Sequence, residues 1–406
     1  MAIIIRSNRG SRWFGGSVWA SFRARLGGGA IILAVAWAPS ALAQNANDPF
    51  FDSTVQLSQA IGFERLYQEL LVIQTLDRPY PSELTELVQI VGDHFQRFVG
   101  TLSDIDIDLA AEFFQVVDAI DEGIERNQLV ALDVIDVVSW VQIAFALLDD
   151  AYNLVVPREI RDEPVFRAAI MAQLLLGEGG VADALNAAFS EEWHFANGWA
   201  ATQRVKVMWA DIRDLATPEQ QLEFDEAIAS LDEIYKSIEP SLEGLEPDDA
   251  EAPARRVVGL LEAVVDAELS TGRNPLSLAG HLTQLAAEGC THYEAGDDRR
   301  GREVMYAVLD HYAGGTTGFS VTISTLAPEV HVAAMGALEA LVGVEDIRDV
   351  GRLVNIRRAI NAAENAPAVA AVDPPTDIEE VELMDGGQVC RSLVEALGEA
   401  NAALGG

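Results

Sequence analysis

Acidic residues far outnumber basic ones in this chain of 406 residues: 64 aspartates and glutamates stand against 27 lysines and arginines, for a net charge of −37. A surface of that sign repels phosphate groups and anionic lipid headgroups. The composition therefore excludes nucleic acid as a partner and favours a protein or cationic partner. Half of the residues are hydrophobic, which is enough to bury a core and excludes a wholly disordered chain.

The first 43 residues have the order of a bacterial export signal. Five arginines and no acidic residue accompany an apolar run, Ala30–Ala38, which ends at Pro39 and is followed by small residues. This pattern predicts a signal peptide at 1–43 that is cleaved before Gln44. A helix needs roughly 20 apolar residues to span a bilayer, and this run has nine, so cleavage is preferred. The alternative is that the segment is retained as a membrane anchor. The remaining 363 residues would carry a net charge of −42, and we expect a periplasmic or secreted protein.

Helical periodicity governs most of the chain after the signal. Apolar residues recur at helical spacing, and prolines or capping residues separate the segments. The pattern predicts about a dozen helices, among them 61–73, 82–98, 104–126, 129–155, 165–176, 275–288 and 328–342. The segment 129–155 is more fully apolar and is expected to be the central helix. Its apolar run 137–148 is too short to cross a bilayer, so no integral membrane span is expected after signal cleavage.

Several helix starts have clear local signals. Thr217 precedes Pro218, and Gln220 follows at the third helical position, which is the order of a capping box with proline at the first position. Pro275 and Pro328 are expected to open two further helices in the same way.

Two glycines predict interruptions. Gly289 is expected to end the helix that Pro275 opens, because glycine commonly follows a helix end. The pair Asn197-Gly198 is a turn signal, so a turn is expected between Trp193 and Trp199.

The best domain boundary is an acidic, proline-rich segment. Residues 239–253 contain three prolines and six acidic residues and are unsuited to a packed core. We therefore predict an N-terminal helical domain, 44–245, and a C-terminal helical domain, 246–406, with a proline-rich linker at 365–377. The expected fold class is all-α, a helical bundle or an irregular α-solenoid of about a dozen helices.

One segment also fits a strand. Residues 319–325 alternate apolar and hydroxyl side chains with a period of two, and a small two-stranded ribbon with 381–383 is one interpretation. The spacing of Phe319, Ile323 and Leu326 fits a helix as well, and the helix is preferred.

The two cysteines, Cys290 and Cys390, are the whole complement of the chain. In an oxidising compartment they are expected to form a disulfide bond, which would hold the last segment against the body of the protein. The alternative is two separate buried thiols.

Metal-ligating spacings are present but incomplete. Glu191 and His194 form a Glu-x-x-His pair, which dimetal sites of helical bundles use in two copies, and the chain has one copy. A capped helix start with Ser190 as N-cap explains the acidic residues equally well. His292 follows Cys290 in a lone Cys-x-His, which is weak for zinc. Asp104–Asp108 resembles a calcium loop without its glycine and closing glutamate, so no cofactor is expected.

Aromatic residues gather in one stretch. Trp193, Trp199 and Trp209 could form a platform for a ligand if they were exposed, or could fill the core if they were buried. The core interpretation is preferred, because Trp193 and Trp199 do not share a helix face.

The chain contains none of the common nucleophile, zinc-protease or phosphate-loop motifs. We expect a binding or scaffolding component of the bacterial envelope. The alternatives are an α-helical metal-dependent or hydrolytic enzyme, with Glu191 and His194 or the His281–His311 region as its site, and a purely structural protein.

Overall fold

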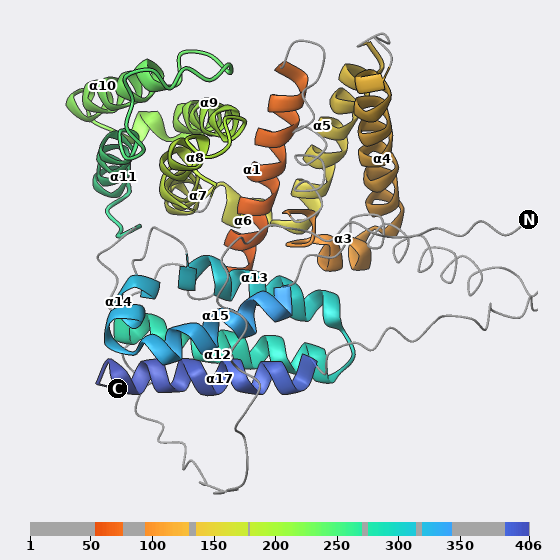
Figure 1. The fold of residues 1–406 in the computed structure, drawn as a ribbon, viewed down its shortest axis with the longest axis vertical. Coiled ribbons are helices and arrows are strands. Elements are labelled where there is room, and N and C mark those ends of the chain that lie inside the picture. Colours follow the sequence, from red (N-terminus) through yellow and green to blue (C-terminus); the bar gives the residue numbers. More distant parts are fainter. Residues whose placement is uncertain are drawn as a thin grey trace, which may run out of the picture. The chain divides into compact units, whose positions relative to one another are not determined.

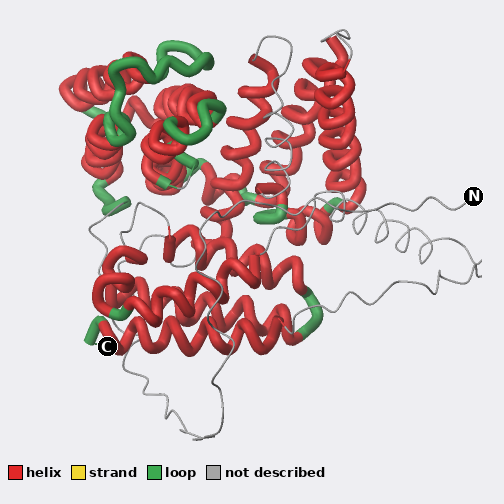
Figure 2. The backbone as a smooth tube through the Cα atoms, viewed as in Figure 1, coloured by secondary structure: helices red, strands yellow, loops and turns green. Residues whose placement is uncertain are grey.

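The computed structural model describes residues 53–75, 94–129, 135–177, 179–269, 275–313, 319–342 and 386–405. Figure 2 shows that the regular structure of these residues is helical throughout, which confirms the all-α prediction. Residues Ala43–Gly406 form one compact unit, and the description below concerns that unit. The predicted signal, most of the predicted helix 82–98, the linker 365–377 and the segment 381–383 lie outside the described residues.

The helices before residue 270 surround a first hydrophobic core, and Figure 1 shows how these helices are arranged. A short 3₁₀ helix, Arg213–Leu215, lies between the helices His194–Ile212 and Pro218–Ile234. These helices are α1 (Thr54–Thr75), α3 (Val99–Ile105), α4 (Ile107–Leu129), α5 (Ile135–Val155), α6 (Arg158–Arg161), α7 (Pro164–Leu176), α8 (Val181–Ala188), α9 (His194–Ile212), α10 (Pro218–Ile234) and α11 (Glu251–Val265).

The later helices surround a second hydrophobic core. They are α12 (Pro275–Glu294), α13 (Asp298–Ala313), α14 (Phe319–Leu326), α15 (Pro328–Val342) and α17 (Gly386–Ala403). Figure 1 shows α17 alongside α12, and it also packs on α15. The predicted disulfide between Cys290 and Cys390 is confirmed: it joins α12 to α17 with a Cα–Cα distance of 5.6 Å.

The two cores divide after α11. The first core extends to Leu269, and the second begins at Leu278. Helix α11 follows the acidic, proline-rich segment 239–253, yet it packs on α7 and α10. The first hydrophobic core therefore continues past this segment, and the domain boundary at 245/246 stays a prediction.

Helix α1 occupies the centre of the arrangement. It packs on α5, α7 and α9 of the first core and on α13 of the second, and residues on all of its faces are buried. The prediction that 129–155 is the central helix is wrong, because α5 leaves Trp140, Ile143 and Leu154 exposed. Although α5 has a long apolar run, it is not completely buried.

Buried polar side chains of α1 have partners on distant helices, as burial requires. Ser58 donates to the Asp310 carboxylate over 2.5 Å, and Gln59 donates to the Thr101 hydroxyl over 2.9 Å. Glu64 accepts from Arg204 over 2.8 Å. These bonds tie α1 to α3, α9 and α13.

The three helix starts predicted at Pro218, Pro275 and Pro328 are confirmed. Thr217 accepts a hydrogen bond from the Gln220 backbone over 3.2 Å, and the Gln220 side chain accepts from the Thr217 backbone over 2.9 Å, so α10 begins with a complete capping box. Helices α12 and α15 begin at Pro275 and Pro328.

The two predicted interruptions are wrong, and both glycines serve close packing instead. Helix α12 continues past Gly289 to Glu294, and a Cβ atom at Gly289 would lie 2.7 Å from Met305 on α13. Helix α9 continues through Gly198, where a Cβ atom would lie 2.4 Å from the Tyr235 ring. Because glycine has no side chain, it allows a neighbouring segment to approach the helix backbone closely, and it also allows a turn.

Residues 319–326 form the helix α14, with Phe319 and Ile323 buried. The helical interpretation is confirmed, and the ribbon at 319–325 is wrong. Among the described residues, one stretch, Pro164–Ala188, is long and apolar enough to cross a membrane by length and composition. It comprises α7 and α8, and 76% of its most apolar window is buried inside the protein, as expected for helices that fill a core.

Candidate functional site

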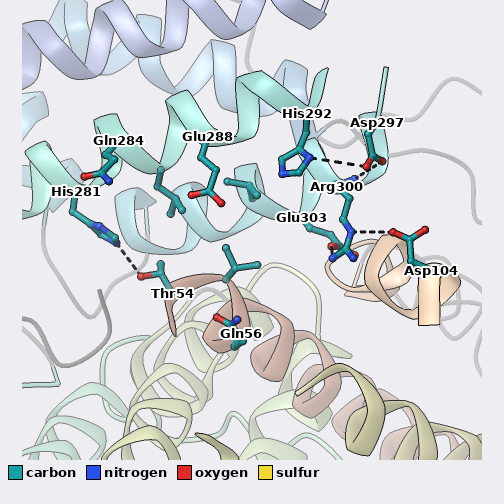
Figure 3. A pocket seen from close by; sticks show the side chains of 13 residues that line it. Thr54, Gln56, Asp104, His281, Gln284, Glu288, His292, Asp297, Arg300 and Glu303 are labelled. Carbon is teal, nitrogen blue, oxygen red and sulfur yellow. Dashed lines mark hydrogen bonds and ion pairs between the residues drawn. The ribbon is translucent and has the colours of Figure 1, made fainter. Parts of the chain in front are cut away.

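A cleft of about 640 Å³ lies where α1, α3, α12 and α13 meet. Val55, Leu285 and Val304 provide its apolar lining. Figure 3 shows its polar side chains, which converge from all four helices. They are Thr54, Gln56, Asp104, His281, Gln284, Glu288, His292, Asp297, Arg300 and Glu303.

Glu303 is the most deeply buried charged group of the cleft, with 1% of its surface exposed. Its carboxylate accepts the Thr101 backbone N–H and the Thr101 hydroxyl, both over 2.8 Å. Gly100 permits this contact, because a Cβ atom there would lie 3.0 Å from Glu303 Oε1. Burial raises the pKa of Glu303 to about 7, although the hydrogen bonds from Thr101 oppose the shift.

Both oxygens of Glu303 are thus held by the backbone and hydroxyl of Thr101. A carboxyl group with a pKa near 7 suits proton transfer, but its depth and these bonds keep it from direct contact with a ligand. Its geometry fits the role of fastening α13 to α3 beneath the cleft.

Among the residues that line the cleft, Arg300 is the one permanent cation. Its Nε atom donates to Asp104 over 3.2 Å, and its Nη1 atom lies 3.5 Å from Glu303 Oε2 and contacts the Thr101 hydroxyl. Arg300 is therefore already engaged by two carboxylates and a hydroxyl of the protein.

The two histidines of the cleft also have protein partners. His281 is buried, and its Nε2 atom lies 2.9 Å from the Thr54 hydroxyl at the start of α1. His292 Nδ1 lies 4.0 Å from Asp297, and the Asp297 carboxylate also accepts the Arg300 backbone N–H over 3.4 Å at the start of α13.

Glu288 differs from the other carboxylates of the cleft. It is exposed on α12 and makes no ion pair or side-chain hydrogen bond with the described residues. In Figure 3 its side chain projects from α12 into the cleft. Asp104 and Asp297 also line the cleft, so three carboxylates stand beside one arginine without counting Glu303, whose raised pKa keeps much of it protonated near pH 7. The site therefore has a negative potential that attracts cationic groups.

Of the three candidate metal ligands from the sequence, Glu191 and His194 lie close together and His292 does not join them. Glu191 and His194 come together, with Glu191 Oε2 at 3.6 Å from His194 Nε2, and the same oxygen accepts from the Trp193 indole over 3.0 Å. Burial lowers the pKa of His194. Helix α9 begins at His194 and has no side-chain cap, so the predicted N-cap at Ser190 is wrong.

His292 lies in the cleft, away from these residues, and Cys290 next to it is held in the disulfide and cannot supply a thiolate. His311 does not line the cleft; it is buried, with its Nδ1 atom 2.9 Å from the Ala307 carbonyl. Among the described residues, no three His, Cys, Asp or Glu side chains are placed to hold a metal ion.

The tryptophans do not form an open platform. Trp209 is buried and stacks on Phe224, with ring centroids 3.8 Å apart. Trp193 and Trp199 are partly buried and pack against the first core. Trp193 stacks on His194 at 3.8 Å.

Sequence reasoning missed Thr101, Arg300 and Glu303 as members of one site. The one available signal was a carboxylate on the apolar face of α13, where Glu303 adjoins Val304 and Ala307. In the sequence, Asp104 stands out only as part of an incomplete calcium loop.

No model of a protein family matches the chain, and no curated protein or solved structure is significantly similar to it.

Proposed function

We propose that the protein is an exported, acidic binding or scaffolding component of the bacterial envelope, and that the cleft between α1, α3, α12 and α13 receives a positively charged group of its partner. The observation that carries this proposal is the charge of the cleft. Four carboxyl groups line it, and its one arginine is engaged by Asp104 and Thr101.

Glu288 is the residue we assign to ligand contact. It is exposed, and it has no competing cation among the described residues. An ammonium or guanidinium group in the cleft would meet the Glu288 carboxylate directly, with Gln284 on the same helix as a further hydrogen-bonding group. A lysine or arginine side chain of a protein partner has this chemistry, and so does a free polyamine.

The charge of the whole chain supports the same class of partner. A net charge of −37 speeds the encounter with cationic molecules and opposes encounter with nucleic acid. Export is a further part of the proposal and rests on residues 1–43. Amino-terminal sequencing of natively produced protein tests it: a start near Gln44 supports export, and an intact Met1 contradicts it.

Binding is tested by calorimetric titration of the purified protein with tri-arginine, with tri-glutamate as the negative probe. We expect tri-arginine to bind and the affinity to fall as NaCl rises from about 0.05 M to about 0.5 M, because salt screens the carboxylates. Glu288→Gln is expected to weaken binding several-fold.

The matched control is Glu339→Gln. Glu339 is an exposed carboxylate on α15, outside the cleft. Equal losses from the two substitutions would show diffuse attraction to the acidic surface and would contradict a site in the cleft, as would the absence of tri-arginine binding.

A further inference from the structure

The Thr101 hydroxyl beneath the cleft has all of its hydrogen-bonding capacity in use. It accepts from Gln59 Nε2 over 2.9 Å and from Arg300 Nη1, and it donates to Glu303 Oε2 over 2.8 Å. A hydroxyl offers one hydrogen and two lone pairs, so these three bonds leave no lone pair for a further donor. The arrangement is therefore that of ionised Glu303, with Oε2 as an acceptor.

A proton on Glu303 requires a different arrangement. Oε1 faces the Thr101 backbone N–H, which is fixed as a donor, so the proton resides on Oε2. There it must be donated to the Thr101 hydroxyl, which then has three donors for two lone pairs. Gln59 is 3% exposed, whereas 32% of the Arg300 side chain is exposed and Asp104 already accepts from its Nε atom. Arg300 is therefore the donor that leaves Thr101.

The charge of the cleft depends on the same proton. In formal charges, with Glu303 protonated and the histidines neutral, three carboxylates and one arginine give the lining residues a net charge of −2, and ionisation of Glu303 makes it −3. Protonation also releases the Arg300 guanidinium toward Asp104, which lies beside it in Figure 3. Both changes oppose the entry of a cation. Burial raises the pKa of Glu303 to about 7, so both forms are populated near neutral pH.

Other ionisable side chains share the cleft with Glu303. On α15, Glu329 and Glu339 are exposed, and His331 lies 3.2 Å from Tyr312, more than two helical turns along α13 from Glu303. Helix α1 contributes no ionisable side chain to the cleft, and α14 has none. Because histidine titrates between about pH 5 and pH 8, the histidine charges must be separated from that of Glu303. The ionisable residues of α3, α12 and α13 that line the cleft with Glu303 are Asp104, His281, Glu288, His292, Asp297 and Arg300.

We propose that Glu303 is the proton-dependent charge of the cation site, so that a cation entering the cleft releases the Glu303 proton to solvent. This inference rests on the function proposed above, in which the cleft receives a cationic group. One positive charge enters, the proton leaves, and Arg300 returns to the Thr101 hydroxyl. A proton that leaves on binding also means that the affinity for the cation rises with pH as Glu303 ionises. Glu303 is a positioning residue, because it acts through Arg300 and through its charge.

Calorimetric titration of His292→Gln with acetylated and amidated tri-arginine tests the proposal. The peptide has no group that titrates between about pH 5 and pH 9, and the substitution removes the charge of the histidine next to Glu288 in the cleft. Titrations near pH 7 in two buffers of different ionisation enthalpy give the number of protons released. A coupling of about tenfold predicts release of about 0.4 proton near pH 7 and an affinity that rises about fivefold from about pH 6 to about pH 8.

The matched controls are two double variants. In His292→Gln/Glu303→Gln the proton release and the rise in affinity should be absent. In His292→Gln/Glu339→Gln both should persist, because Glu339 is an exposed carboxylate outside the cleft.

The outcomes separate this inference from the proposed function. Binding to His292→Gln without proton release would overturn the inference and leave the cationic-ligand cleft intact. Release that survives Glu303→Gln would assign the proton to a different group and would overturn the inference as well. Failure of the peptide to bind would contradict the proposed function, and the inference with it.

A spectroscopic measurement leaves Glu303 and its bonds to Thr101 in place. In the infrared difference spectrum of His292→Gln near pH 7, tri-arginine should remove the C=O band of a protonated carboxyl group. The band should shift in protein labelled with ¹³C-glutamate and stay unchanged in protein labelled with ¹³C-aspartate. A band that does not respond to the peptide, or that follows the aspartate label, would overturn the inference.

Discussion

Glu303 should make the protein more stable in mild acid than in mild alkali. Its carboxyl group is buried where α13 meets α3, and burial raises its pKa from 4.5 to about 7. A raised pKa in the folded state means that folding favours the protonated form. The resulting stability is fully present below pH 4.5 and is lost as the pH rises through about 7.

The magnitude follows from the shift. A change of one pKa unit corresponds to 1.36 kcal/mol, so a rise from 4.5 to about 7 corresponds to about 3 kcal/mol between strongly acidic and alkaline limits. Near pH 5 the unfolded carboxyl is already mostly ionised while the folded one is still protonated, and about 2.5 kcal/mol of this difference is present. Near pH 8 almost none remains.

Glu303→Gln removes this titration and preserves the shape of the side chain. The loss of hydrogen bonds to Thr101 and Arg300 lowers stability at every pH, so the comparison uses the difference between two pH values within each protein. Urea unfolding near pH 5 and near pH 8, followed by circular dichroism, should show that the wild type loses about 2.5 kcal/mol more than Glu303→Gln.

Glu339→Gln, an exposed carboxylate on α15, is the control and should retain the wild-type pH dependence. Equal pH dependence of the wild type and Glu303→Gln would refute the raised pKa. A wild type that instead gains stability relative to Glu303→Gln as the pH rises would mean that Thr101 and Arg300 outweigh burial.

Three further outcomes follow from packing, covalent structure and charge. Gly198→Ala should lower the free energy of unfolding by about 1–3 kcal/mol, because the added methyl group overpacks against Tyr235. Gly259→Ala on α11, where the glycine has open space around it, should raise the free energy of unfolding by about 0.5–1 kcal/mol. Urea titration distinguishes the two signs, and equal effects would refute the close contact at Gly198. Replacing Cys290 and Cys390 by serine should lower stability by roughly 4–5 kcal/mol, because the bond spans 100 residues of sequence, and non-reducing mass spectrometry should detect no free thiol in the wild type. The melting temperature should rise with NaCl because salt screens the 64 carboxylates; an unchanged or lower midpoint in molar NaCl would count against self-repulsion.

Local signals predicted the parts of the fold that local chemistry determines. The capping box of Thr217 and Gln220 acts within one helical turn, and Pro275 and Pro328 begin helices because a proline at the first position gives up no helical hydrogen bond. The all-α class follows from the period of the apolar residues alone.

Predictions that depend on tertiary neighbours were wrong for identifiable reasons. Gly198 and Gly289 carry the local signals of a turn and of a helix end, but Tyr235, directly after α10, and Met305 on α13 pack on them. Helix α5 was expected at the centre because of its long apolar run, 137–148, yet α1 takes that position.

The cleft could not be predicted from the sequence either, because its residues come together only in the tertiary structure. Thr101 and Glu303 are separated by 202 residues, and Thr54 and His281 by 227. No local spacing connects such pairs. His292 was identified as a possible zinc ligand through Cys290, and its place in the cleft beside Asp297 became apparent only from the fold.

Hydrogen–deuterium exchange of the protein with and without tri-arginine tests the cationic-ligand cleft most directly. We expect slower exchange in the peptides of α12 and α13 that cover Gln284–Arg300. The protection should be reversed by about 0.5 M NaCl and absent in Glu288→Gln. Protection centred on α10, which carries more carboxylates than any wall of the cleft, or protection spread evenly over the acidic helices, would contradict it.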